Sequence, residues 1–261
     1  MSHELQPLGP DRLLVWDLLR ETDPYYLNHH LFDTDFTAVE ADRDRRRAAG
    51  RPVPSYVAYA LAAYGRTLAA HPRLNGYLRL WPRTRLSVFD GVDIALTIER
   101  FHDHQRIVLL ALLRNAAHLS LDEIVGFLHS RRDQPLESLE EWKAYQRLQR
   151  IPAFCRWHLF QLFVKPFPDL LRRLVGTTAF TSVGKFGTTA TTPLSPRSCT
   201  LSLGCVEHRP RVVAGIVRPA LSSWLTVTYD HRIADGADIA RFGTALRSRL
   251  ETWNGEDGTP S

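Results

Sequence analysis

An alternating run near the C-terminus is the part of this sequence that limits the possible fold most strongly. This run leads directly to a histidine. Residues 225–229 alternate between apolar side chains and threonines, which predicts a half-buried strand that ends at Asp230. His231 follows, and residues 237–250 then have the apolar spacing of a helix. The chain therefore carries a titratable imidazole at the junction between a strand and a helix.

Asp235 and Gly236 occupy the same junction. Glycine adopts positive φ without steric cost, so we expect Gly236 to let the backbone turn sharply before the helix. Asp235 is a short acid of the kind that begins helices. Two interpretations follow. Either His231 is a structural histidine and Asp235 only a helix-start acid, or the turn and the acid hold the imidazole in place for chemistry.

Residues 229–237 resemble a signature of the coenzyme A-dependent acyltransferases. This superfamily includes chloramphenicol acetyltransferase and the catalytic domain of the E2 subunits of 2-oxo acid dehydrogenase complexes. His231, Asp235 and Gly236 match the HxxxDG pattern of the family. An aspartate directly before the histidine, here Asp230, resembles the pattern of the E2 branch. Carrier-dependent condensation domains usually have a second histidine at that position.

A second stretch strengthens the resemblance. Residues 181–187, followed by the strand-like residues 201–204, are similar to the second E2 signature at nearly the same distance upstream. Weaker likeness reaches the first half of the chain, in residues 32–37, the helix-like residues 53–68 and the strand-like residues 91–96. The resemblance implies an α/β fold, the chloramphenicol acetyltransferase-like two-layer sandwich, in which helices cover a mixed sheet.

The resemblance also implies catalytic roles. His231 is expected to be the general base that takes the proton of an acceptor as it attacks a thioester carbonyl, a task that suits a neutral imidazole. Thr181 falls where the family has a serine whose hydroxyl stabilises the oxyanion. Threonine keeps that donor and adds a methyl group, so Thr181 serves if its rotamer is suitable, and otherwise Ser182 does. Both are alternatively ordinary strand and turn residues.

Asp235 is expected to anchor the loop more than to act on the histidine. In the family the equivalent acid pairs with an arginine near the N-terminus, and the best-placed candidate here is Arg12, with Arg20 as the competing partner. A bidentate arginine–carboxylate pair would hold the loop firmly. Asp230 and Gly236 complete the expected loop.

The chain is expected to be a single acyltransferase catalytic domain, residues 1–261, without a lipoyl domain or a subunit-binding domain. Residues 133–175 are expected to form a helical insert that departs from an E2 core. Its aromatic segment, residues 156–167, has three interpretations: an extra helix packed on the domain or on a neighbouring subunit, a lid or apolar acceptor pocket, or a site of membrane-surface contact through flanking basic residues.

Composition fits a soluble enzyme-sized domain of 261 residues, of which 44% are hydrophobic. The net charge is +5, but basic and acidic residues are interspersed, which argues against a nucleic-acid partner. Residues 43–47, rich in arginine, are expected to be a solvated helix face. We find no targeting signal and no metal-type spacing among the cysteines 155, 199 and 205, so we expect free thiols in the cytoplasm and no metal.

The resemblance implies an enzyme that transfers an acyl group, foremost acetyl, from acyl-CoA to a hydroxyl of a small-molecule acceptor. Similar short E2-like proteins acetylate tetronate intermediates in bacterial polyketide pathways. Two alternatives remain: acyl exchange between lipoyl groups and coenzyme A in a split complex, and a non-catalytic oligomeric scaffold. The family implies a homotrimer with active sites at subunit interfaces, where residues 25–30 would contribute to the acceptor side of a neighbouring subunit's channel.

Overall fold

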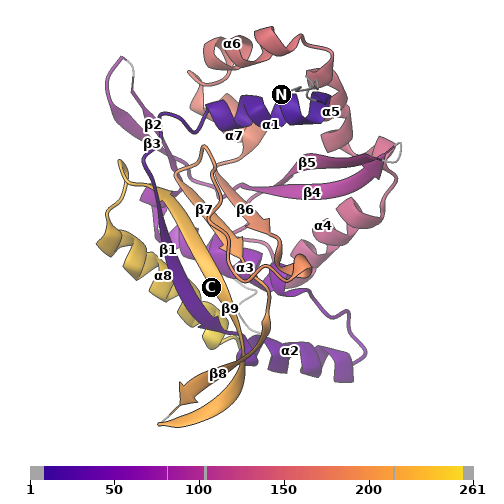
Figure 1. Cartoon of the computed structure of the whole chain (residues 1–261), viewed down its shortest axis with the longest axis vertical. Helices are drawn as coiled ribbons and strands as arrows, with labels where there is room; N and C mark the ends of the chain where they lie inside the picture. Colours follow the sequence, from indigo (N-terminus) through magenta and orange to yellow (C-terminus); the bar gives the residue numbers. More distant parts are fainter. Residues whose placement is uncertain (1–8, 81, 103–104, 214, 255–261) are drawn as a thin grey trace, which may run out of the picture.

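A computed structural model describes residues 9–80, 82–102, 105–213 and 215–254. Its centre is a mixed seven-stranded sheet (Figure 1). Strands β7, β6 and β4 run parallel to one another, and the other neighbouring pairs are antiparallel. In spatial order the strands are β1 (Leu27–Asp35), β9 (Ile216–Asp230), β7 (Cys199–Leu203), β6 (Thr178–Ser182), β4 (Ile94–His102) and β5 (Gln105–Leu113), and β8 (Glu207–Val213) pairs with the first part of β9.

A separate hairpin of β2 (Gly76–Arg79) and β3 (Arg85–Val88) lies beside the sheet. The α-helices are α1 (Pro10–Arg20), α2 (Thr37–Ala48), α3 (Tyr56–Ala70), α4 (Leu121–Asp133), α5 (Glu140–Gln149), α6 (Ala153–Phe163), α7 (Pro168–Val175) and α8 (Gly236–Glu251). Short 3₁₀ helices are η1 (Pro72–Leu74), η2 (Leu136–Ser138) and η3 (Gly184–Phe186). Residues 133–175 are thus largely helical, and the strand and helix predicted around His231 are confirmed as β9 and α8.

One face of the sheet is apolar and is covered by α3 and α8. Tyr64 and Phe242, from these two helices, are fully buried against each other and against sheet residues such as Leu201 and Val227. Burying large apolar side chains contributes about 1.5–3 kcal/mol each, so this layer is a major source of stability. The N-cap Ser55, which accepts a hydrogen bond from the backbone N–H of Ala58, begins α3.

The opposite face of the sheet is rich in hydroxyl groups. Thr200, Ser202, Thr226 and Thr228 alternate with the core residues of β7 and β9 and are nevertheless buried. The segment 188–197 covers part of this face, because the Cys205 N–H donates to the Thr188 carbonyl and Thr191 shares a hydrogen bond with Ser202. The sheet therefore separates an apolar helix-covered side from a polar side.

Residues 43–47 are only partly the solvated face that the sequence predicts. Arg46 is buried and its guanidinium pairs with Asp42 and Asp122, at 3.1 and 2.6 Å. The reason is tertiary: Arg46 faces α4, the helix that bears Asp122, and a buried guanidinium needs such partners. Its neighbours Arg45 and Arg47 remain exposed.

The insert packs at one end of the molecule (Figure 1). Trp142 of α5 forms a small second core with Ile107 and Leu109 of β5. Helix α6 lies against α1, where Arg156 and Asp17 form a largely buried ion pair at 2.7 Å. The helical part of the chain thus binds both the sheet edge and the N-terminal helix.

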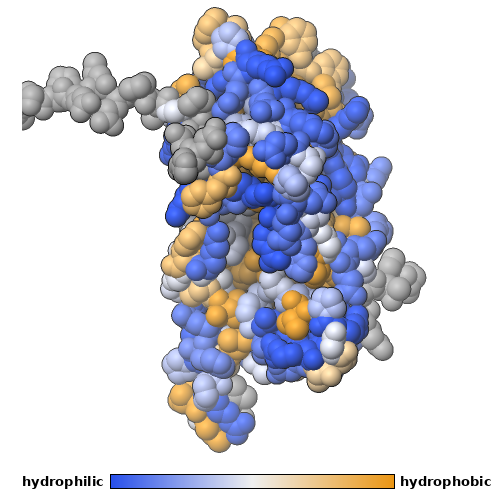
Figure 2. Space-filling view, turned by 90° about the vertical axis from the view of Figure 1, so that its right-hand side faces the viewer, coloured by the Kyte–Doolittle hydropathy of each residue, from blue (hydrophilic) through white to orange (hydrophobic). Residues whose placement is uncertain are grey.

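The aromatic segment of the insert is only partly packed. Arg20 of α1 lies over the ring of Trp157, whereas Phe154, Leu162 and Phe163 are more than half exposed. Figure 2 shows hydrophobic side chains gathered at the end of the molecule that bears α6. No helix among the described residues is long and apolar enough to cross a membrane.

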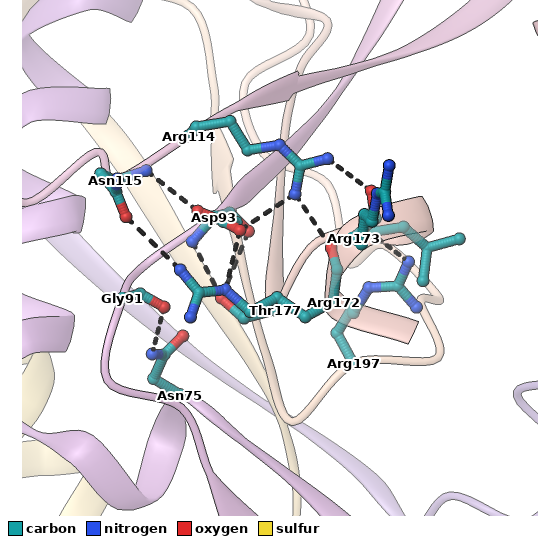
Figure 3. A network of polar contacts seen from close by, with 10 residues as sticks. Asn75, Gly91, Asp93, Arg114, Asn115, Arg172, Arg173, Thr177 and Arg197 are labelled. Atoms are coloured by element: carbon teal, nitrogen blue, oxygen red, sulfur yellow. Dashed lines mark hydrogen bonds and ion pairs between the residues drawn. The ribbon is translucent and has the colours of Figure 1, made fainter. Parts of the chain in front are cut away.

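A buried carboxylate joins the insert to the sheet (Figure 3). Asp93, before β4, accepts hydrogen bonds from Arg114 at 3.0 Å, from Arg172 of α7 at 2.9 Å and from the backbone N–H of Asn115 at 2.9 Å. Its backbone carbonyl accepts from the N–H of Thr177. Burial would raise the pKa of Asp93, but these hydrogen bonds and cations hold it below its ordinary value.

We expect Asp93→Asn to lower the free energy of unfolding by about 2–3 kcal/mol, because it leaves two arginines without their shared charge partner. The folded-state pKa lies below the unfolded value, so this stabilisation is present at neutral pH and is lost as the pH falls through the folded-state pKa. Urea unfolding at pH 7 measures the loss. The matched control is Asp133→Asn, whose pair with Arg132 is exposed to solvent, so its loss should leave the stability nearly unchanged. Equal losses in the two variants would contradict the assignment.

Candidate active site

His231 stands directly after the longest strand of the sheet. Strand β9 is held on both sides over its last residues, by β1 and by β7, so its end is fixed by two ladders of backbone hydrogen bonds. The His231 N–H then donates to the Tyr26 carbonyl at 2.9 Å. Its imidazole is exposed and lies 5.7 Å from the ring of Tyr229, measured between ring centroids. The backbone is thus rigid while the ring remains accessible.

The two residues flanking His231 form a tight ion pair. Asp230 is fully buried and accepts from the Arg232 guanidinium at 2.6 Å and 2.9 Å, and from the Arg232 backbone N–H at 3.1 Å. Hydrogen bonds to Asp230 raise the pKa of Arg232 above its ordinary value, so the guanidinium stays charged. The predicted loop residue Asp230 therefore clamps the turn in which His231 sits.

Asp235 is the N-cap of α8. Its carboxylate accepts hydrogen bonds from the backbone N–H groups of Ala237 and Asp238, at 2.9 and 3.0 Å. The Asp235 N–H in turn donates to the Asp238 carboxylate, which completes a capping box. The expectation of a positive φ at Gly236 is wrong, because Gly236 is already the first residue of the helix. The chain instead turns at residues 231–233.

The structure does not form the predicted pair between Asp235 and Arg12 within one chain. Arg12 is exposed on α1, which packs on α6, and Arg20, the competing partner, lies over Trp157. Asp235 already has backbone donors as a helix cap, so it needs no arginine to be satisfied. Among the described residues the loop is instead anchored by Asp230 and by the Ile233 carbonyl, which accepts from Arg73 at 3.1 Å.

The two candidate oxyanion donors, Thr181 and Ser182, end strand β6 and point to opposite faces of the sheet. Ser182 shares the side of the core residue Phe180, and its hydroxyl donates to the Leu203 carbonyl at 2.9 Å. Thr181 pairs in register with Ser202 on the polar side. Gly204 keeps this region tight, because a Cβ there would lie 1.9 Å from a backbone oxygen of the covering segment.

One chain does not bring Thr181 and His231 together. Thr181 is level with Ser202 and Thr226 across the sheet, and His231 lies five residues beyond Thr226. At about 3.3 Å per residue this is roughly 16 Å along the strand, in addition to two strand spacings of about 4.8 Å across it. A base and a donor that far apart cannot contact one reacting carbonyl.

The structure also reveals a cluster that sequence reasoning largely missed. Tyr25 and Tyr77 are close to Glu21, Arg197 and Arg232, from segments far apart in the chain. Burial raises the pKa of Tyr25 to about 12. Only Arg232, inside the histidine signature, and Tyr25, in the segment expected on the acceptor side, carried any signal in the sequence.

Cysteines and potential metal ligands form no additional candidate site among the described residues. The three cysteines are free, and Cys199 and Cys205 are buried. Burial raises the pKa of Cys199 to about 12, which keeps it a neutral thiol. Within the described ranges, no cluster of three or more His, Cys, Asp or Glu side chains is arranged to hold a metal ion.

Comparison with known proteins assigns the C-terminal part of this fold. Residues 174–255 match the family model of the 2-oxoacid dehydrogenases acyltransferase (catalytic domain). The dihydrolipoyllysine-residue acetyltransferase component of the pyruvate dehydrogenase complex of Corynebacterium glutamicum is 39% identical over 87 residues, which cover 31% of this chain. This part of the chain is therefore similar to the catalytic domain of coenzyme A-dependent acyltransferases. The matched part is a small fraction of that relative, 13% of its length.

Solved structures extend the likeness in fold to nearly the whole length of the chain. The dihydrolipoamide acetyltransferase of Azotobacter vinelandii matches with a TM-score of 0.71 at 21% identity, covering 96% of this chain and 92% of that one. Chloramphenicol acetyltransferase matches with a TM-score of 0.52 at 15% identity, covering 96% and 100%. The predicted mixed sheet covered by helices is therefore confirmed.

We expect Asp235→Ala to lower the free energy of unfolding by about 1 kcal/mol, because the first turn of α8 loses its cap. Asp235→Asn should retain most of the stability, since an asparagine oxygen accepts the same backbone hydrogen bonds. Chemical denaturation of the three proteins measures the difference. An equal loss in Asn and Ala variants would show that the charge of Asp235, and hence an ion pair, is what matters.

Proposed function

We propose that this chain is an acyltransferase that moves an acyl group, foremost acetyl, from acyl-CoA to a hydroxyl of a small-molecule acceptor. The observation that carries this proposal is the setting of His231. A buried ion pair and two strand ladders fix its backbone, while its ring is exposed to an approaching substrate. The similarity to coenzyme A-dependent acyltransferases supports acyl-CoA as the donor.

The proposed reaction needs one base and no covalent enzyme intermediate. The acceptor oxygen attacks the thioester carbonyl carbon while the neutral imidazole of His231 takes the hydroxyl proton. The tetrahedral oxyanion then collapses, the carbon–sulfur bond breaks, and the coenzyme A thiolate leaves. The imidazolium returns the proton to that thiolate, which regenerates the base and releases the ester.

Thr181 is the better candidate for the oxyanion donor. Its hydroxyl is on the polar side of the sheet, whereas that of Ser182 is engaged by Leu203. Because Thr181 and His231 are far apart within one chain, the donor would come from a neighbouring chain. A study of the Azotobacter vinelandii relative concerns a serine, a histidine and an asparagine in catalysis, and that asparagine follows the histidine at the same spacing as Asp235 follows His231.

We propose a homotrimer, in which residues 25–30 contribute to the acceptor side of the shared site. The hairpin of β8 and β9 supports an interface, because it projects from the body of the molecule (Figure 1). Val212, Ile216 and Val217 near its tip are 71%, 55% and 67% exposed, which is costly in water unless another surface covers them. A similar fold builds the cubic core of a pyruvate dehydrogenase complex.

Acyl exchange with a lipoyl group is the second candidate, favoured by the names of the curated relatives. A panel of acyl-CoAs separates the two: free thiol release is followed with small alcohols in one arm and with dihydrolipoamide in the other. Faster release with alcohols supports the first candidate, and faster release with dihydrolipoamide supports the second. We further propose that residues 1–261 act as a single catalytic domain in the cytoplasm, a reducing compartment that suits free thiols.

His231→Ala should lower kcat by at least about 100-fold and leave the fold intact, because the side chain is exposed and fills no core. Steady-state thiol release measures the rate, and circular dichroism checks folding. The matched control is His129→Ala, an exposed histidine on α4, which should keep the wild-type rate. A folded His231→Ala protein with near-normal turnover would remove the histidine from the mechanism.

Thr181→Val should lower kcat by about 100-fold or more with little change in acyl-CoA binding, and Ser182→Ala should be mild. Trimers assembled from equal amounts of His231→Ala and Thr181→Val chains should recover about a quarter of wild-type activity, because a quarter of the shared sites then combine an intact base with an intact donor. Light scattering verifies the trimer. Mixed trimers no more active than their parents would contradict a shared site.

A further inference from the structure

A cleft of about 270 Å³ opens beside the histidine loop, residues 231–235 between β9 and α8. Its walls come from four places: the residues before β1, the β2–β3 hairpin, the turn between α6 and α7, and Arg232 in the turn after β9. Two prolines and two leucines provide apolar walls, and Tyr25 and Tyr77 provide two phenol rings. The volume is near the lower limit of small-molecule pockets, about 300 Å³, so it suits a compact ligand.

Three cations also line the cleft: Arg79, Lys165 and Arg232. Lys165 is paired with Glu21 at 2.9 Å and Arg232 with Asp230. The guanidinium of Arg79 has no ion pair or hydrogen bond to any residue that the structure describes. An apolar cleft with one cation left over is a favourable environment for an anion.

The adjoining Arg197 adds to this positive charge. It acts electrostatically on both Tyr25 and Tyr77, and its buried Nε has no hydrogen-bond partner. Four cations therefore face two carboxylates, Glu21 and Asp230. Burial raises the pKa of both phenols, to about 12 for Tyr25, so both remain neutral hydrogen-bond donors near pH 7 and do not cancel the charge.

The position of the cleft connects it to the chemistry. Arg232 is the residue after His231, and Tyr25 precedes Tyr26, whose carbonyl holds the His231 N–H. The far wall carries Lys165 from the helical insert. A second cavity, of about 180 Å³ and lined in part by α2, α3 and α4, is less suitable for an anion. Its Arg46 and Arg51 are already paired with Asp122, and its Arg66 donates to the Leu119 carbonyl.

We propose that this cleft binds the carboxylate of the acceptor, a small hydroxy acid whose apolar or aromatic body lies between the two tyrosine rings. The proposal rests on the proposed function, because it names the acceptor class of the same site. Arg79 forms a charge-assisted hydrogen bond to the carboxylate, and the tyrosine hydroxyls donate to it. The acceptor is thereby oriented with its hydroxyl toward the histidine loop.

The binding experiment uses 4-(hydroxymethyl)benzoate and its neutral isostere 4-(hydroxymethyl)benzamide as probes, titrated calorimetrically into the full chain without acyl-CoA. We expect the acid to bind at least about tenfold more tightly than the amide, as for one charge-assisted hydrogen bond. Arg79→Gln should remove that preference. Arg85→Gln is the matched control, because Arg85 is the register partner of Arg79 on β3 but does not line the cleft. Equal binding of acid and amide, or an Arg79→Gln chain that binds the acid normally, overturns the proposal.

Turnover with acetyl-CoA forms the second arm. We expect kcat/KM for the acid to fall about tenfold in Arg79→Gln, while KM for acetyl-CoA stays unchanged. A raised KM for acetyl-CoA with unchanged kcat/KM for the acid would mean that the anion in the cleft is a coenzyme A phosphate, which overturns the acceptor assignment. Arg79-dependent binding of the acid without acetyl transfer would instead overturn the proposed function and leave the anion preference of the cleft standing.

Discussion

The end of strand β9 is the constraint on which the rest of the structure depends. Its last residues are hydrogen-bonded to β1 on one side and to β7 on the other, so no shift along the sheet is possible without breaking both ladders. Asp230, fully buried at the end of this strand, has to be neutralised, and Arg232 does so across one intervening residue. That intervening residue is His231, and the ion pair therefore projects the imidazole outward at a fixed place.

The same sheet also separates the chemistry. Its pleat sends Ser182 to the core side, where a backbone carbonyl takes its hydroxyl, and Thr181 to the polar side. Its register keeps Thr181 and His231 far apart, even though both lie at strand ends. The two sequence signatures are expected to serve one reaction, but within one chain they lie at two separate places. The shared site that we propose between chains would resolve this separation, and the exposed apolar tip of the β8–β9 hairpin offers a surface on which chains could meet.

Outside the two signatures, residues 133–175 shape the surroundings of the turn that bears His231. The helices of the insert are held to the sheet by the Asp93 network (Figure 3). They are held to α1 by the ion pair of Arg156 and Asp17. This fastening brings Lys165 opposite the β2–β3 hairpin and makes a wall for the cationic cleft. In the function that we propose, the turn that bears His231 would set the class of reaction, and residues 133–175 would help to select the acceptor.

By itself the sequence determined the local elements: the alternating run predicted the strand before His231, the helix after it, and Asp235 as a helix-start acid, because these depend on periodicity and capping within a few residues. It could not determine the partner of Asp235, the conformation of Gly236 or the burial of Arg46, since each depends on which distant element packs nearby. It also missed the group of Tyr25, Tyr77, Arg79 and Arg197, whose members are scattered along the chain. Only the tertiary structure decided these, because charge pairing and cavities arise where separate segments are brought together.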